Sequence, residues 1–275
     1  MRPTPLAVRG RPERQGSWYV VAVLGLGEAG GLFARGLVQA GAVVRGYDPR
    51  LTAPDGVIDN PDAASACHGA DLVLSVNSAA DALDALAQGL PGCTPGTIWA
   101  DLNTAAPAVK QAVQDAAGTS LRVVDVAIMA PVTPKGLGTP MTVSGSSAEE
   151  YAAAMRRHGA TIDVIEGPVG AAATRKLLRS VFYKGLAAAV VEALAAAEAV
   201  GVCDWLSDNI TAELIGFNAS TLDRLVAGSR IHAERRVHEM EAASQLLDAL
   251  GVPARVSRAS RDWLVELADR GRPEA

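Results

Sequence analysis

The chain has 275 residues, of which 49% are hydrophobic and 20% are charged, and its formal net charge is −5 at pH 7. This composition is typical of a folded protein with one large or two ordinary domains, and it excludes a disordered chain. Because the net charge is negative, no basic surface is expected for nucleic acid or an anionic membrane, and neither is expected as a partner.

Residues 1–16 hold three prolines and four arginines, and they lack the apolar core of a signal peptide. We expect them to form a flexible tail. The cysteines and histidines are scattered along the chain without metal-ligand spacing or a disulfide framework. We therefore expect no metal site and a location in the reducing cytoplasm.

A glycine-rich turn follows the first strand pattern, residues 18–24, and opens a helix pattern at residues 28–40. Its sequence is Gly25-Leu26-Gly27-Glu28-Ala29-Gly30. Gly25 allows a tight turn, Gly27 lets the backbone approach a diphosphate, and Gly30 lets the helix pack closely on the sheet. The free N–H groups and positive end of the helix attract phosphates. The motif in this context indicates a dinucleotide-binding site.

The next strand pattern, residues 42–47, ends in Asp48. A carboxylate at this position accepts hydrogen bonds from an adenosine ribose and repels a 2′-phosphate. Arg50 would offset part of that repulsion. The expected cofactor is NAD or NADP, with NAD slightly favoured.

Strand and helix patterns alternate up to about residue 166. Strands are predicted at 18–24, 42–47, 71–76, 97–101, 121–128, 141–144 and 161–165, and helices at 28–40, 60–68, 79–88, 105–117 and 147–158. Asn60-Pro61 and Ala106-Pro107 mark two expected helix starts, because proline is tolerated in a first turn. The alternation predicts an α/β fold: a Rossmann-like, doubly wound parallel sheet in a dinucleotide-binding domain at residues 17–167.

From Gly170 onward only helix patterns remain, at 171–201, 204–214, 217–228, 231–250 and 254–270. They predict an all-α C-terminal domain, residues 168–275, joined by a long interdomain helix that is rich in alanine. We expect this domain to serve substrate binding and dimerisation. No membrane span is expected, because Glu192 and Glu198 interrupt the most apolar stretch.

Hydride transfer to or from a carbinol needs a proton carrier, usually lysine, histidine or tyrosine. On the long helix, Ser180 lies about 40° from Lys176 and Tyr183 about 20° from it on the other side, whereas Lys184 is about 80° away. Lys176, Ser180 and Tyr183 thus share one face and are candidate catalytic residues. Taken alone, a lysine at position 176 is more often a solvated helix cation than a catalytic residue.

The segment from Gly167-Pro168-Val169-Gly170 to Lys176 resembles the signature of the β-hydroxyacid dehydrogenase superfamily, which includes 3-hydroxyisobutyrate and 6-phosphogluconate dehydrogenases. The resemblance extends from about Trp18 to Gly251, and the C-terminal part resembles a short helical domain of unknown function. It implies an NAD(P)-dependent oxidoreductase that acts on a small β-hydroxy acid or its carbonyl counterpart. It further implies Lys176 as the acid/base, and a homodimer built from these helices.

The same resemblance assigns further residues to the cofactor. Asn77 and Ser78 fall in a loop that touches it, and Thr104 falls on the threonine beside the nicotinamide. Asn103 replaces the serine before that threonine, and could equally cap the next helix. His238 stands where relatives have a lysine that approaches the nicotinamide, although this helix face could instead be solvated and internally paired.

Two departures from the family pattern leave the substrate open. Met129, Ala130 and Pro131 replace the usual substrate loop, Ser180 replaces an asparagine, and Arg179 precedes it as a further candidate substrate ligand. One alternative is an imine reductase that uses Tyr183. Another is a dinucleotide-binding sensor without turnover.

Overall fold

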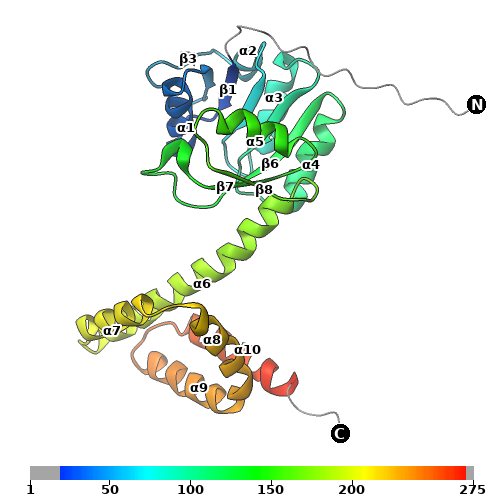
Figure 1. The fold of residues 1–275 in the computed structure, drawn as a ribbon. Coiled ribbons are helices and arrows are strands. Elements are labelled where there is room, and N and C mark those ends of the chain that lie inside the picture. The colour runs from blue at the N-terminus through cyan, green and yellow to red at the C-terminus, as the bar shows by residue number, and fades with distance from the viewer. Residues whose placement is uncertain (1–18, 271–275) are drawn as a thin grey trace, which may run out of the picture. The chain divides into compact units, whose positions relative to one another are not determined.

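The computed structural model describes residues 19–270 and divides the chain into two compact units (Figure 1), one ending at Leu178 and one beginning at Arg179. The tail expected at residues 1–16 and Trp18 of the first strand pattern lie outside the described residues.

The first unit is built on one eight-stranded sheet with the order β3-β2-β1-β4-β5-β6-β7-β8. The strands are β1 (Val20–Leu24), β2 (Val43–Tyr47), β3 (Ile58–Asp59), β4 (Leu72–Ser75), β5 (Thr97–Asp101), β6 (Leu121–Ile128), β7 (Met141–Ser144) and β8 (Ile162–Val164). All neighbouring strands are parallel except β6 and β7. The strand order reverses beside β1, and in such sheets ligands bind at the carboxyl ends of the strands on either side of the reversal.

The antiparallel strand β7 departs from the wholly parallel sheet that the sequence predicted. Between Ile128 and Met141 the chain forms only the short 3₁₀ turn η2 (Gly136–Gly138). A parallel return needs a longer crossover, usually a helix, so the chain turns back on itself here. The two-residue strand β3, which pairs with Arg45 and Gly46, was not predicted.

Five helices cover the two faces of the sheet. They are α1 (Glu28–Gln39), α2 (Ala63–Cys67), α3 (Ala82–Gly89), α4 (Pro107–Ala117) and α5 (Ala148–Arg156), with the 3₁₀ turn η1 (Leu90–Gly92) after α3. Val21 and Val23 of β1 pack in one core cluster with α1 and α5, whereas Ala22 and Leu24 pack in another with α2, α3 and α4. Because alternate side chains point to opposite faces, both faces are covered and the predicted doubly wound fold is confirmed.

Of the two helix starts predicted from proline, one is confirmed and the other is wrong. Pro107 occupies the first turn of α4, as expected. Helix α2 begins at Ala63 rather than near Asn60-Pro61. The reason is Asp62, whose side chain accepts a hydrogen bond of 2.7 Å from the Ser65 amide and caps the helix there.

The second unit is helical, as predicted. Helix α6 (Ala171–Ala199) begins in the first unit, and α7 (Cys203–Ile215), α8 (Ala219–Ile231), α9 (Ala233–Ala249) and α10 (Arg255–Arg270) follow. Glu192 of α6 caps α10 by accepting hydrogen bonds from the Val256 amide (2.7 Å), the Ser257 amide (2.8 Å) and the Ser257 hydroxyl (2.7 Å). Burial alone would raise the pKa of Glu192, but these hydrogen bonds outweigh burial and lower it.

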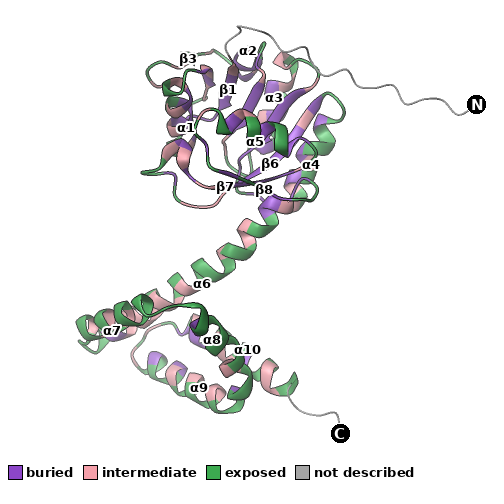
Figure 2. Cartoon of the chain, viewed as in Figure 1, coloured by how far each residue is buried: buried purple, intermediate pink, exposed green. Residues whose placement is uncertain are grey.

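Many residues of the second unit are exposed (Figure 2). They include large apolar residues such as Ile215, which is 81% exposed. Helix α6 is long and apolar enough to cross a membrane by length and composition alone. One such helix is weak evidence for a membrane span. Exposed apolar surface of this kind is typical of a protein–protein contact.

Candidate functional site

The glycine-rich turn has the geometry that its spacing predicts. Gly25 has a φ of +93°, and a Cβ there would lie 2.3 Å from the Val76 carbonyl oxygen. A Cβ at Gly30 would lie 1.9 Å from the Gly25 oxygen, whereas a Cβ at Gly27 would meet nothing within 4 Å. Gly25 and Gly30 therefore allow the turn to close, and Gly27 leaves its outer side open to a ligand.

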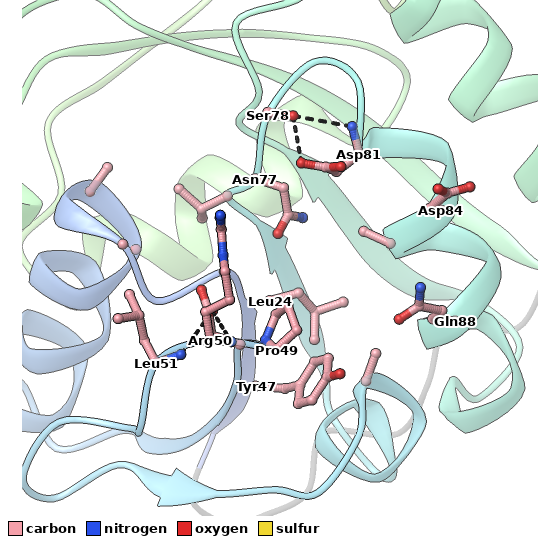
Figure 3. Close-up of a pocket in the computed structure, with 18 of the residues that line it drawn as sticks. Leu24, Tyr47, Pro49, Arg50, Leu51, Asn77, Ser78, Asp81, Asp84 and Gln88 are labelled. Atoms are coloured by element: carbon pink, nitrogen blue, oxygen red, sulfur yellow. Dashed lines mark hydrogen bonds between the residues drawn. The ribbon is translucent and has the colours of Figure 1, made fainter.

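A cavity of about 610 Å³ opens beside this turn (Figure 3). Its volume lies in the usual range for a small-molecule site, roughly 300–1,000 Å³. Eight of the predicted cofactor residues line it: Gly25, Gly27, Glu28, Ala29, Gly30, Asp48, Asn77 and Ser78. Leu26 instead lines an adjacent hollow of about 360 Å³, together with Arg35 and Thr52.

Backbone amides hold the Asp48 carboxylate. Its Oδ2 accepts a hydrogen bond from the Leu26 amide at 2.8 Å, and its Oδ1 accepts from the amides of Arg50 at 2.8 Å and Leu51 at 3.1 Å. A carboxylate offers about four acceptor positions, so one remains for a ribose hydroxyl. The Arg50 side chain extends into the same cavity (Figure 3).

Asn103 joins two loops at the carboxyl edge of the sheet. Its side chain accepts a hydrogen bond from the Asn77 amide and donates one to the Ser75 hydroxyl at 3.4 Å, while its own amide donates to Asp101 Oδ1 at 2.9 Å. The N-cap of α4 is Ala106, so the alternative that Asn103 caps this helix is wrong. Asn103 is buried and fixes the loop that leads to Thr104.

Lys176 of α6 meets Thr104 in the first unit. Its Nζ lies 2.7 Å from the Thr104 Oγ1, although 72 positions separate the two residues in the sequence. Asn103, which precedes Thr104 in the chain, and Asp125 of β6 lie beside this contact. The structure thus brings together the lysine and the threonine that the sequence singled out separately.

The loop after β6 contacts the glycine-rich turn. Met129 packs in a small cluster with Ala127, Ile165 and Ala172, whereas Pro131 is exposed. Further along the loop, the Thr133 hydroxyl donates a hydrogen bond of 2.9 Å to Glu28 Oε1. This link between the loop and the dinucleotide cavity was not predicted.

Four predicted site residues belong to the second unit: Arg179, Ser180, Tyr183 and His238. The Arg179 guanidinium lies 4.1 Å from the centre of the Tyr183 ring, a cation–π contact. His238 is exposed on α9, where Arg235 and Glu239 form an ion pair one turn apart. That pairing agrees with the alternative of an internally paired helix face.

The cavity also contains residues that the sequence reasoning missed, namely Tyr47, Asp81, Asp84 and Gln88. The last three lie at and after the start of α3, at intervals of three and four residues. That helical spacing is the signal that could have revealed them, because it places side chains on one helix face.

A doubly wound sheet with an open, glycine-rich turn at its reversal point defines a dinucleotide-binding domain of the Rossmann class. The chain belongs to the family of the NAD-binding domain of 6-phosphogluconate dehydrogenase, whose family model matches residues 20–169. Residues 197–267 match a domain of unknown function. The predicted resemblance is confirmed, and the family is one of NAD(P)-binding oxidoreductases.

Two curated proteins are similar to the chain. An uncharacterised 28.5 kDa protein of Methanothermus fervidus is 32% identical over 62% of this chain and 65% of its own length, slightly less than two thirds. The 3-hydroxyisobutyrate dehydrogenase of Pseudomonas aeruginosa is 28% identical over 71% of this chain and 68% of its own. Among solved structures, an imine reductase from a Pseudomonas species is 21% identical, with a TM-score of 0.73 over 93% of this chain and 95% of that one. This last likeness shows the fold alone.

Proposed function

We propose that the protein is an NAD(P)-dependent oxidoreductase that transfers hydride between the nicotinamide and a small β-hydroxy acid or its carbonyl counterpart. The observation that supports this proposal is the 2.7 Å contact between Lys176 Nζ and Thr104 Oγ1. Thr104 follows the carboxyl end of β5, the edge of the sheet on which the glycine-rich turn also lies. A proton carrier and a hydroxyl therefore stand together at the edge where this class of fold binds its ligands.

The residues present fit a dinucleotide. The open side of Gly27 and the free amides at the start of α1 suit a diphosphate, and Asp48 keeps one acceptor position for a ribose. The bound nicotinamide would accept or donate the hydride. In the oxidation direction, Lys176 takes the proton of the substrate hydroxyl, and in the reduction direction it returns that proton. Thr104 orients the lysine nitrogen through their hydrogen bond.

The charges of the cavity favour NAD modestly over NADP. Glu28, Asp48, Asp81 and Asp84 line it, against the single cation Arg50 among its lining residues. The 2′-phosphate of NADP would add negative charge to this acidic surrounding, which is unfavourable. Arg50 could pair with that phosphate, so the expected preference is small.

Imine reduction is the second candidate, with Tyr183 as the proton donor. The Arg179 guanidinium contacts the Tyr183 ring at 4.1 Å from the ring centre. The Tyr183 phenol could protonate the nitrogen of an imine. Under this hypothesis, turnover depends on the hydroxyl of Tyr183 and not on Lys176.

The test combines purified protein, NAD or NADP, and panels of β-hydroxy acids and cyclic imines. With a substrate that is turned over, Lys176→Ala should lower kcat by about 10²–10⁴-fold and leave dinucleotide affinity nearly unchanged. Lys176→Arg should be almost as slow, because a guanidinium does not release its proton. Lys184→Ala, which removes an exposed lysine of the same helix, is the matched control and should have little effect.

Tyr183→Phe separates the two enzymatic candidates. A small effect supports the hydroxy-acid reaction, whereas loss of activity in Tyr183→Phe with an active Lys176→Ala supports imine reduction. Tight dinucleotide binding without turnover of any panel member would support a sensor. We also propose a cytoplasmic location, in keeping with the free thiols of Cys67, Cys93 and Cys203.

A further inference from the structure

A buried ion triad lies behind the contact between Lys176 and Thr104. Lys110 of α4 is 1% exposed, and its Nζ donates a hydrogen bond of 2.8 Å to the Asp101 carbonyl oxygen. The same nitrogen lies 3.3 Å from a carboxylate oxygen of Asp101 and 3.3 Å from one of Asp125. Both aspartates are at most 1% exposed. Apolar side chains could often replace such a group without loss of stability, so its presence requires another explanation.

One arm of the triad fixes the helix that carries Lys176. Asp125 Oδ2 accepts hydrogen bonds from the amides of Gly170 at 3.0 Å and Ala173 at 2.9 Å. Ser144 Oγ accepts one from the Ala172 amide at 3.0 Å. These sheet side chains satisfy the N–H groups that the first turn of α6 leaves unpaired, and the positive end of the helix favours the Asp125 charge. Lys176 follows Ala173 by about one turn.

The other arm fixes the loop that carries Thr104. Asp101 Oδ1 accepts a hydrogen bond of 2.9 Å from the amide of Asn103, the residue before Thr104. Lys110 contacts both the carboxylate and the carbonyl oxygen of Asp101. The buried ammonium of Lys110 therefore connects Asp101, which fixes the Thr104 loop, with Asp125, which fixes the start of α6.

We propose that Lys110, Asp101 and Asp125 are positioning residues that hold Lys176 against Thr104 for proton transfer. The proposal rests on the proposed function, in which Lys176 carries the proton. Misplacement of a reacting group by about 1 Å can cost about 10²-fold in rate. A rigid connection through buried charges reduces such misplacement.

The first test measures the order of the Lys176 side chain without any substrate. The chain has four lysines, Lys110, Lys135, Lys176 and Lys184, so protein labelled with ¹³C at lysine Cε gives four signals that single Lys→Arg variants assign. In the wild type, the heteronuclear NOE of Lys176 should exceed that of Lys135 and Lys184, which are exposed. In Asp125→Asn it should fall to their level. An unchanged NOE in the folded variant would overturn the proposal.

The second test measures turnover with the substrate found by the panels. Asp125→Asn should lower kcat by about 10- to 100-fold while KM and dinucleotide Kd stay nearly constant. Added to Lys176→Ala, it should cause little further loss, because the residue that it positions is absent. An equal further loss in the double variant would show a merely structural role and overturn the proposal. If Lys176→Ala alone left kcat unchanged, the proposed function would be refuted, and the NMR result would remain valid.

Ser144→Ala keeps the test decisive if Asp125→Asn does not fold, because it retains all three charges. It removes the acceptor of the Ala172 amide, so the Lys176 NOE should fall partway and kcat by about 5-fold. Thr97→Val is the matched control. It removes a buried strand hydroxyl that bonds the Ala70 carbonyl oxygen, away from α6, and should leave both values unchanged. If Ser144→Ala and Thr97→Val behave alike, the proposal is wrong.

Discussion

Replacing Gly27 by aspartate should separate folding from dinucleotide binding. Gly27 is the N-cap of α1 with a φ of −60° and a ψ of −165°, and a Cβ there would meet nothing within 4 Å. A side chain therefore fits without strain. Aspartate is a better N-cap than glycine by a few tenths of a kcal/mol, so the free energy of unfolding should be unchanged or rise slightly.

Gly27→Asp should also weaken dinucleotide binding strongly. With a diphosphate at the start of α1, the new carboxylate would stand about 4 Å from a phosphate charge, and at an effective dielectric constant of about 20 the repulsion is about 4 kcal/mol. Each 1.4 kcal/mol changes an equilibrium constant tenfold, so the Kd should rise by about 10³-fold.

Calorimetric titration of the Gly27→Asp variant with NAD and NADP measures this loss, and thermal unfolding checks that the protein remains folded. Gly27→Asn is the matched control, because it has the same shape and no charge. The Gly27→Asn variant should bind NAD and NADP more tightly than Gly27→Asp does. The difference in binding free energy should be most of the estimated repulsion of about 4 kcal/mol. Equal losses in both variants would refute the electrostatic argument, and a wild-type Kd in a folded Gly27→Asp would refute the placement of the diphosphate.

Three further outcomes are expected. Arg50→Ala should weaken NADP about tenfold more than NAD in calorimetry, since one ion pair with the 2′-phosphate is lost; an equal effect on both would contradict this role. Glu192→Gln should lower the unfolding free energy by about 1 kcal/mol at pH 7. Because the pKa of Glu192 is lowered in the folded state, its contribution is full above about pH 4.3 and disappears as the pH falls through the folded pKa, so the difference from wild type should vanish in acid. Light scattering at micromolar concentration should give the mass of a homodimer, whereas a monomer mass would contradict the idea that a second copy covers the exposed apolar side chains.

Most of the fold could be predicted because each element has a strong local pattern. Residues 97–101, 121–128 and 141–144 are strands within the predicted bounds. The direction of β7 was missed, although no helix had been predicted between 128 and 141, and that gap was a usable signal. The strand β3 has only two residues, Ile58 and Asp59, too few for any periodicity.

The site was predictable where chemistry follows a motif, and not where it depends on distant contacts. The glycine-rich turn has a fixed spacing, and the sequence therefore predicted that its residues would line the cavity. Lys110 resembles an ordinary surface cation of an amphipathic helix, and only the fold places it between Asp101 and Asp125. In the same way, the bond of Asp48 to the amide of Leu26 depends on how two loops meet.

The start of α6 limits how freely the two halves of this chain could be exchanged with other proteins. A chain shortened to begin at residue 168 would keep the whole helix but lose Asp125 and Ser144, the acceptors for the amides of Gly170, Ala172 and Ala173 at its start. That turn would then fray into water close to Lys176. A chimera that takes its helical half from this protein therefore needs a recipient sheet with a carboxylate and a hydroxyl at the matching strand positions.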